Sequence, residues 1–269
     1  GHAAYLGIGA YTPAVLTVFL GWPVLPAMAL SMLAAGVLAL IVGVFVIRLG
    51  GIAFMMVTLA IGQMAHAYFF RNRALGGDDG LGGTLRPDLT ALGLDMADAT
   101  AFSAYAVVLA AAAYAALALV ARSPFGHALA AIRQNERRMA ALGCAVRGHK
   151  LAAYAAAAAG AGLAGSLLAQ QSGFVSPELM FWTVSGEALI MVIIGGMGSI
   201  VGAAAGAAVI VLLRDTLSSL TEFWLLGMGL FFIAVVAFAR QGIHGVATAL
   251  LRLLGVAGRV PGGPGSGNA

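Results

Sequence analysis

Charged residues are scarce in this 269-residue chain, where only 9% of positions are Asp, Glu, Lys or Arg and 61% are hydrophobic. Soluble domains carry about 25% charged residues and about 45–50% apolar residues, so a soluble globular domain is excluded. Cysteine is also nearly absent, and the single Cys144 excludes an intramolecular disulfide. Lys150 is the only lysine and no G-x-x-x-x-G-K-[ST] motif occurs. The chain therefore cannot hold ATP phosphates in the manner of a P-loop protein.

The motifs of hydrolytic enzymes are missing as well. The histidines form no H-E-x-x-H pair, and no G-x-S-x-G sequence occurs. We therefore expect no catalytic residue, no bound metal and no enzyme activity, and an intramembrane hydrolase is the weakest alternative. The sequence pI of about 9.6 would suggest a nucleic-acid partner for a soluble protein. Here basic cytoplasmic loops account for it, and we expect no nucleic-acid partner.

What the chain has in abundance is long apolar runs, and its mean hydropathy is +0.99. A helix needs roughly 20 apolar residues to cross a bilayer core of about 30 Å. The runs are continuously apolar rather than alternating, which favours helices over a β-barrel. They cover residues 3–20, 24–47, 52–70, 99–121, 151–171, 181–195, 199–213 and 223–239. The sequence predicts an all-α, polytopic transmembrane helix bundle.

Proline and glycine interrupt this pattern. Pro13 and the pair Pro23 and Pro26 are expected to break the first region. The glycines at 195, 196 and 198 divide residues 181–213 into two halves of roughly 15 residues, each short for a full span. We expect broken, tilted or re-entrant Gly-rich helices there. Two crossings are preferred to one broken span.

The orientation is predicted from charge. Residues 122–150 carry six basic side chains and one acidic side chain, whereas residues 71–98 carry three basic and five acidic ones. Because cytoplasmic loops are enriched in Lys and Arg, we place 122–150 inside and 71–98 outside. With two crossings in 181–213, the arginines at 240, 252 and 259 also lie inside. The Pro/Gly/Ser-rich end of the tail, within 246–269, is expected to be disordered.

The basic segment has helix signals of its own. Ser123 followed by Pro124 predicts a capped helix start, and Gly143 predicts its end. Apolar residues between them predict one continuous stripe, and these are Phe125, Leu129, Ile132, Met139 and Leu142. Such a helix can present its polar sides to a cytoplasmic partner or can rest on anionic lipid headgroups. The residues alone leave both interpretations open.

Six stretches in order resemble the permease subunit of branched-chain amino acid ABC importers, the LivM-type family. They are GHAAYLGIGAY (1–11), GIAFMMVTLAIGQM (51–64), GGDDGLGG (76–83), SPFGHALAAIRQNERRMAALG (123–143), the glycine-rich 173–207 and RQGIHG (240–245). The resemblance implies a permease domain over residues 1–245. It also implies that further spans precede Gly1, which is not an initiator Met.

The resemblance further implies alternating access driven by ATP on other chains. The expected partners are two cytoplasmic ABC ATPases that hold ATP and Mg, a second homologous permease, an extracytoplasmic substrate-binding protein and membrane lipid. This chain would bind no cofactor itself, and it would lie in the bacterial inner membrane. The ATPase-coupling residues would be Phe125, Gly126, Leu129, Ile132, Arg133, Asn135, Glu136, Arg137, Arg138 and Gly143. A permease for urea or short amides is an alternative, as is a self-contained secondary transporter or channel.

Polar and glycine residues within the apolar runs are candidates for the translocation path. Ionisable groups at membrane depth are expensive and therefore often functional, which applies to Glu187 and His66. Gln63 lies on the same helical face as His66. Glycines permit broken helices that line a pathway, but they equally permit close helix packing or a turn. The glycine candidates are Gly195, Gly196 and Gly198. A structural hydrogen bond of Glu187 and an interfacial position of His66 are the competing interpretations.

Asp78 and Asp79 lie between glycines in the predicted external loop. Their spacing does not match a calcium-binding loop. The family resemblance implies a flexible external turn that contacts the substrate-binding protein. A solvated turn without a partner is the alternative.

Overall fold

The computed structural model describes residues 1–84, 86–88, 96–196, 198–220 and 223–238. The chain divides into two compact units, Gly1–Ser185 and Gly186–Ala269. Each unit is described by itself. The predicted tail, the arginines at 240, 252 and 259 and the RQGIHG stretch lie outside the described residues.

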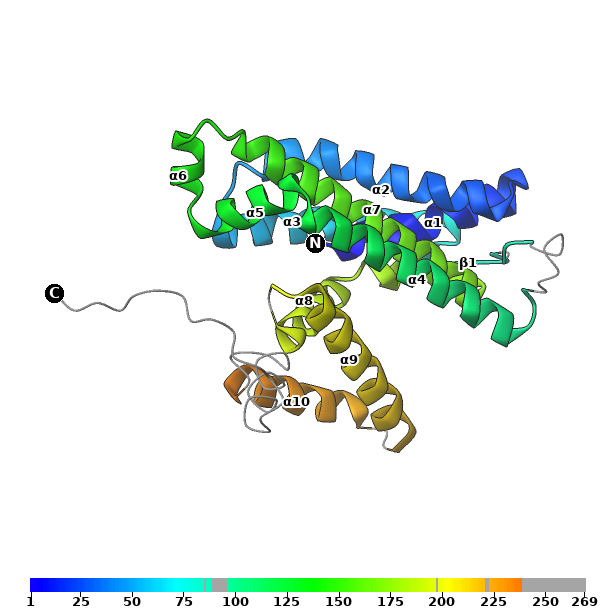
Figure 1. Ribbon diagram of the computed structural model, residues 1–269. Coiled ribbons are helices and arrows are strands. Elements are labelled where there is room, and N and C mark those ends of the chain that lie inside the picture. Colours follow the sequence, from blue (N-terminus) through cyan, green and yellow to red (C-terminus); the bar gives the residue numbers. More distant parts are fainter. Residues whose placement is uncertain (85, 89–95, 197, 221–222, 239–269) are drawn as a thin grey trace. The chain divides into compact units, whose positions relative to one another are not determined.

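Unit 1 is a bundle of helices joined by very short strands and 3-10 turns (Figure 1). Its helices are α1 (Ala3–Leu20), α2 (Val24–Val46), α3 (Gly51–Arg71), α4 (Ala99–Arg122), α5 (Pro124–Gln134), α6 (Glu136–Ala141), α7 (Val146–Ser172) and the start of α8 (Trp182–Gly195). Its short elements are η1 (Arg73–Leu75), η2 (Gly77–Asp79), β1 (Leu81–Gly82), β2 (Phe174–Val175) and η4 (Pro177–Met180). Unit 2 holds the rest of α8, α9 (Ile200–Leu220) and α10 (Trp224–Phe238).

Six helices of the described chain are long and apolar enough to cross a membrane, namely α1, α2, α3, α4, α7 and α9. The helix α8 is apolar but spans only 14 residues. The predicted all-α, polytopic membrane bundle is confirmed. The predicted runs also match the helix limits closely at 3–20, 24–47 and 99–121.

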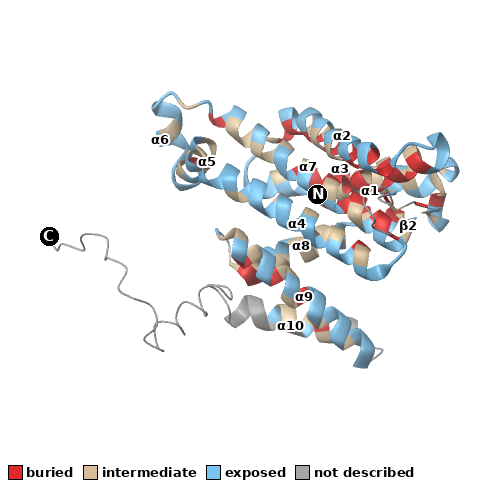
Figure 2. Cartoon of the chain, turned by 45° about the vertical axis from the view of Figure 1, so that its right-hand side comes forward, coloured by how far each residue is buried: buried red, intermediate tan, exposed pale blue. Residues whose placement is uncertain are grey.

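The core of unit 1 is the packing of α1, α2 and α7 (Figure 2). Small residues bring the backbones of these helices into contact, as is common between membrane helices. A methyl group added at Gly9 would overlap the backbone of Gly162, and one added at Gly165 would overlap the carbonyl oxygen of Leu6. The fully buried Ser31 donates its hydroxyl to the Met28 carbonyl oxygen at 2.7 Å. The Ser31 hydroxyl is thus satisfied at this close contact.

The prediction that Pro13 breaks the first run is wrong, because α1 continues through it. A proline in a helix removes one backbone hydrogen bond, and membrane helices tolerate it when neighbours restore the lost contacts. Pro13 is fully buried, so packing of its ring offsets the lost bond, while Thr17 satisfies its own hydroxyl by donating to the Pro13 carbonyl oxygen at 2.8 Å. The break instead falls at Gly21, whose φ is +64°, and α2 starts after Pro23.

The predicted division of residues 181–213 is confirmed, but the length of its second half is wrong. The α9 helix continues to Leu220 and is 21 residues long, enough for a full span. The predicted span ended at residue 213 because two charged residues, Arg214 and Asp215, follow the apolar run. Helical structure continues there because neither residue breaks a helix. The loop expected between 214 and 222 is therefore helical through Leu220.

The two ends of unit 1 carry opposite charge. The elements α5 and α6 lie at one end of the bundle and β1 lies at the other (Figure 1). Charged side chains at the first end are mostly basic, being Arg48, Arg122, Arg133, Glu136, Arg137, Arg138, Arg147 and Lys150. At the second end the described charged side chains are acidic in four cases and basic in three, being Arg71, Arg73, Asp78, Asp79, Arg86, Asp88 and Asp98. This separation agrees with the predicted orientation, in which the basic end faces the cytoplasm.

Candidate functional site

The basic end is built around α5, whose start follows the predicted signals. The Ser123 hydroxyl oxygen accepts the Gly126 N–H at 3.4 Å, and Pro124 occupies the first turn. A side chain at Gly126 would overlap the carbonyl oxygens of Val120 and Ala121. The glycine therefore lets α5 fold back tightly against the end of α4.

The prediction of one continuous helix over 123–143 is wrong, because the chain breaks at Asn135. Asn135 has an extended backbone, and its side-chain oxygen accepts the Arg138 N–H at 3.0 Å. It therefore caps a second short helix, α6, and redirects the chain. The single apolar stripe breaks with it: Ile132 is 6% exposed, whereas Leu142 is 75% exposed. Gly143 ends α6 as predicted, with a φ of +81°.

The polar side chains of this element face outward. Phe125, Leu129 and Ile132 are buried or half-buried. The predicted coupling residues after them are exposed, namely Arg133, Asn135, Glu136, Arg137 and Arg138. The exposed Leu142 was not among the predicted coupling residues. In the sequence, Leu142 falls on the apolar stripe of the predicted helix, and an apolar stripe is normally buried. Exposed arginines beside an exposed leucine give a surface with both charge and an apolar anchor.

Two side-chain contacts tie this basic element to the start of α7. The ring of Phe125 stacks on His149 with centroids 5.6 Å apart. Lys150 forms an ion pair with Glu136 at 2.6 Å. Both contacts join the short helices to α7, the helix that packs on α1 and α2. These contacts therefore connect the basic element to the helix at the centre of unit 1.

The second feature is a stretch of chain without α-helix that lies among helices long enough to cross a membrane. From Gly7 to Leu20, α1 climbs about 20 Å at 1.5 Å per residue. Met180 packs at Gly7, so a methyl group added to that glycine would overlap the Met180 side chain. The segment Phe174–Phe181 therefore descends from the acidic end to well below the end of α1. Non-helical backbone at such depth occurs where protein or a water-filled cavity surrounds it.

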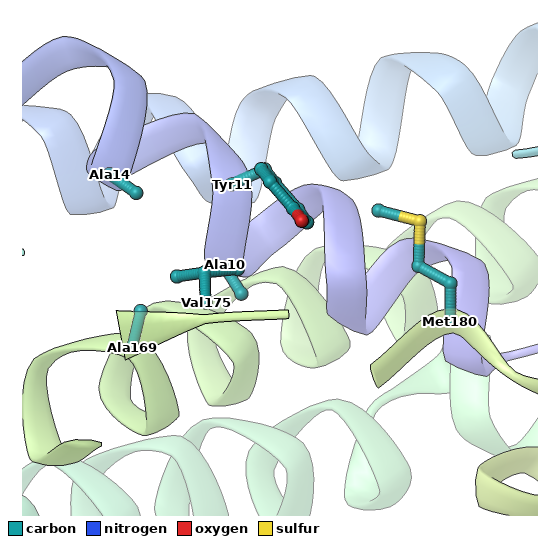
Figure 3. Close-up of a cluster of buried hydrophobic side chains, with 6 residues drawn as sticks. All are labelled: Ala10, Tyr11, Ala14, Ala169, Val175 and Met180. Atoms are coloured by element: carbon teal, nitrogen blue, oxygen red, sulfur yellow. The ribbon is translucent and has the colours of Figure 1, made fainter. Parts of the chain in front are cut away.

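This segment, called here the re-entrant segment, is packed on α1, α3 and α7. Val175 and Met180 join Ala10, Tyr11, Ala14 and Ala169 in one buried cluster (Figure 3). On its other side, Phe181 lies 5.3 Å from the ring of His66, which also stacks on Phe70. The Ser185 hydroxyl oxygen accepts the Ala3 N–H at 3.0 Å. The start of α8 is thereby fixed against the first turn of α1.

The structure brings His66 to the re-entrant segment, and its position relative to the membrane interface stays a prediction. His66 is half-buried between two aromatic rings. Gln63 is also half-buried, one turn earlier on α3. Tyr11 is a polar residue that sequence reasoning missed. Its side chain is 2% exposed, and its hydroxyl has no hydrogen-bond partner in the described part of the chain. Buried hydroxyls are normally paired, so this one is an exception within the packed cluster.

In unit 2, α8 and α9 form an antiparallel hairpin in close contact. A methyl group added at Gly195 would overlap the Gly202 carbonyl oxygen. One added at Gly206 would overlap the Met191 carbonyl oxygen. Gly196 and Gly198 have φ values of +99° and +119° and belong to the turn. Packing and the turn thus account for these glycines, and a path role for Gly195, Gly196 and Gly198 stays a prediction.

Glu187 has an ionic partner in the same hairpin. Its carboxylate lies 3.7 Å from the Arg214 guanidinium, and the Glu187 side chain is 28% exposed. An opposite charge lowers the cost of holding a carboxylate at membrane depth. The structure therefore shows a contact between Glu187 and a neighbouring helix, as the structural interpretation of this residue expected. The contact is an ion pair rather than a neutral hydrogen bond.

Asp78 and Asp79 are exposed at the acidic end. The turn that carries them is followed by a short strand, and the flexibility that we expected stays a prediction. Leu81 and Gly82 pair with Val175 and Phe174 in a two-stranded ladder. Gly76 needs its φ of +90°, and a side chain there would overlap the Gly80 carbonyl oxygen. The ladder joins this external turn directly to the re-entrant segment. Among the described residues no group of three His, Cys, Asp or Glu side chains could hold a metal ion.

Comparison with known proteins agrees with this architecture. The family model described as "Branched-chain amino acid transport system / permease component" matches residues 1–239. The chain belongs to this permease family. It is 31% identical to the high-affinity branched-chain amino acid transport system permease protein LivM of Escherichia coli (strain K12), over 94% of its length. It is 30% identical to the LivM protein of Salmonella typhimurium, also over 94% of its length.

The chain covers 65% of the length of each of these two permeases. No solved structure matches the chain. Family membership confirms the resemblance seen in the six stretches. Two of them, 76–83 and 173–207, contain the two partners of the short ladder, and 123–143 contains α5 and α6.

Proposed function

We propose that the chain is the membrane-spanning permease subunit of an ATP-driven importer for branched-chain or other small amino acids. It lies in the bacterial inner membrane as a multi-pass protein and performs no catalysis itself. The observation that carries the proposal is the re-entrant segment of a permease-family chain. Broken chain at mid-membrane is where transporters place their substrate pathways, because it offers backbone groups and polar side chains to a solute.

The residues around the re-entrant segment suit a small zwitterion. Tyr11 offers a buried hydroxyl without a partner, and His66 and Gln63 are half-buried on α3. These groups supply hydrogen-bond donors and acceptors for such a solute. In unit 2, Glu187 and the turn glycines remain path candidates, with Arg214 as the partner of Glu187. A path of this kind lets an amino acid pass without holding it tightly.

The route by which a motor moves this path is proposed from the contacts. A push on α5 or α6 reaches α7 through Phe125, His149 and the Glu136–Lys150 pair. The α7 helix passes it to α1 through the contact of Gly165 with Leu6. The α1 helix holds Met180 and Ser185 of the broken region. The two states of the transporter must differ in their contacts with the motor, or no coupling exists.

The partners follow from this arrangement. Two cytoplasmic ABC ATPases hold ATP and Mg, and one docks on the exposed residues Arg133–Arg138 and Leu142. A second, homologous permease encloses the pathway with this chain. An extracytoplasmic substrate-binding protein delivers the amino acid at the acidic end, where Asp78 and Asp79 are exposed. Membrane lipid surrounds the apolar helix faces.

The test is reconstitution of the full-length permease with the proteins that co-purify with it. Leucine uptake into proteoliposomes is measured with and without ATP inside, and with and without the binding protein outside. We expect uptake only when both are present. Uptake driven by an ion gradient without ATP would favour a secondary transporter. Flux of urea or short amides with no leucine uptake would correct the cargo.

Crosslinking tests the docking surface directly. A photo-reactive residue at the exposed Leu142 should capture a P-loop ATPase subunit in membranes. The buried Ile132 serves as the matched position that should capture none. Capture of phospholipid alone from position 142 would refute docking there.

A further inference from the structure

The basic end of unit 1 contains a small cleft between the end of α2 and the start of α7. Two arginines flank it: Arg48, just after α2, and Arg147, in the first turn of α7. The remaining lining is glycine and aliphatic side chains, being Gly43, Val44, Ile47, Gly148 and Leu151. Neither guanidinium has a carboxylate partner in the part of the chain that the structure describes. We propose that this cleft binds the headgroup of an anionic phospholipid.

The charge and size of the cleft specify the ligand. Two arginines from separate elements line a space of about 190 Å³. A single water needs about 10–15 Å³ of such space, so the cleft has room for a phosphodiester and its nearest atoms. Guanidinium groups bind phosphate oxygens through paired hydrogen bonds. The first turn of α7 adds backbone N–H groups with the favourable end of the helix dipole.

The surface leading to the cleft explains why the anion is a lipid. On α2, the exposed apolar residues Val37, Ile41 and Val44 lie at spacings of four and three, and Arg48 follows four residues later. These positions form one stripe along a helix that is long enough to span the membrane. An acyl chain can lie along the stripe while its phosphate meets Arg48 and Arg147. Basic pockets between membrane helices on the cytoplasmic side recognise anionic headgroups in this way.

The test is native mass spectrometry of the full-length permease, delipidated and titrated with phosphatidylglycerol or with phosphatidylcholine of the same chains. The wild type should retain phosphatidylglycerol more tightly, because choline places a cation beside the arginines. Replacing both arginines by glutamine, as Arg48→Gln with Arg147→Gln, should weaken phosphatidylglycerol binding about thirtyfold. Arg71→Gln with Arg73→Gln, at the opposite end, is the matched charge control and should change it little.

A second variant blocks the cleft without touching its charge. An added Cβ at Gly148 would lie 3.9 Å from the Ala145 Cβ, an ordinary contact, so Gly148→Leu fills the cleft with little strain. It should weaken phosphatidylglycerol binding as strongly as the arginine variant. Gly160→Leu, on the same helix and with open space at its Cβ, should bind like the wild type. This pair keeps the test decisive even if the arginine variant folds poorly.

Several results would overturn the proposal. Equal retention of the two lipids by the wild type would remove the anion preference. Unchanged binding by Gly148→Leu would show diffuse attraction to surface charge instead of a cleft. Displacement of the lipid by millimolar inorganic phosphate would make the ligand a free anion. If the arginine variant still bound lipid but no longer co-purified with the ATPase, the cleft would be a protein interface. The proposal stands on the cleft alone and does not depend on the transport function.

Discussion

The packed core of α1, α2 and α7 and the basic element α5–α6 are built in opposite ways. In the core, glycines such as Gly9, Gly162 and Gly165 press backbone against backbone, and no methyl group fits. In the basic element, most side chains are exposed, and two side-chain contacts tie it to α7. Substitutions in the core should therefore be tolerated poorly, whereas those at exposed positions of the basic element should leave the fold intact.

The difference separates stability from function within one unit. Tight membrane packing makes α1, α2 and α7 move as one body, because sliding would require gaps between close-packed backbones. The basic element receives a force from outside and needs an exposed, charged surface to do so. Substitutions should therefore sort by region: those in the core should change folded yield, and those in the basic element should change coupling.

The largest expected effect is from Gly165→Ala in the core. Its new methyl group would overlap the Leu6 carbonyl oxygen and force α1 away from α7. We expect a loss of about 3 kcal/mol in stability and a sharp fall in folded yield. Thermal unfolding in detergent measures it. Gly160→Ala, with open space around its Cβ, is the control and should match or exceed the wild type. Equal stability of the two variants would contradict the packing argument.

The next effect is from Arg137→Glu with Arg138→Glu in the basic element. Both side chains are exposed, so the fold should be unchanged. Reversed charge should disrupt docking of the ATPase and lower ATP-driven uptake at least about tenfold. Uptake and ATP hydrolysis are measured together in proteoliposomes. Arg71→Glu with Arg73→Glu controls for charge at the other end. Normal uptake by the first variant would remove the docking surface from 133–138.

A smaller effect is expected from Glu187→Ala in unit 2. The substitution leaves Arg214 without this carboxylate partner on the α8–α9 hairpin. Because the Glu187 side chain is partly exposed, the loss of stability should be about 1 kcal/mol, with a matching fall in uptake. Folded yield and leucine uptake are the two readouts. Glu187→Gln separates charge from shape and should behave like alanine if the ion pair matters. No change in either readout would make Glu187 a bystander.

The smallest effect on stability is expected from Lys150→Met. The Glu136–Lys150 pair is exposed on both sides, so its loss should cost less than about 1 kcal/mol. Its effect on coupling should be larger, because the pair is one of two contacts between the basic element and α7. We expect ATP hydrolysis to continue while uptake per ATP falls. Phe125→Leu tests the other contact. Normal uptake per ATP in the variant that combines Lys150→Met with Phe125→Leu would exclude coupling through these two contacts.

The sequence predicted most of the helices because apolar runs and capping residues act locally. Ser123, Pro124 and Gly143 marked their boundaries correctly, and the family resemblance was correct. The failures have physical causes. Pro13 stays inside α1, where its ring is fully buried and its carbonyl oxygen accepts the Thr17 hydroxyl. The burial depends on neighbouring helices, so no local pattern reveals it. In the sequence, Asn135 resembles any polar residue on a helix face. In the structure its side-chain oxygen accepts the Arg138 N–H and caps α6.

The candidate site was harder to predict. His66 and Gln63 were found because polar residues are conspicuous in apolar runs. The re-entrant segment was not found, since Val175 and Met180 look like ordinary apolar residues. Tyr11 was missed for the same reason: a tyrosine is common in membrane helices, and only its packing shows that its hydroxyl lacks a partner. Contacts between residues far apart in sequence decide these features.

The re-entrant segment also bears on how the chain is assembled. A translocation channel releases helices into lipid because their backbone hydrogen bonds are already closed. Residues 174–181 offer no such closed structure, so lipid cannot receive them on their own. Their place exists only after α1, α3 and α7 have met. Biogenesis of this permease must therefore end with a late step in which an exposed stretch of chain slots between helices that are already inserted.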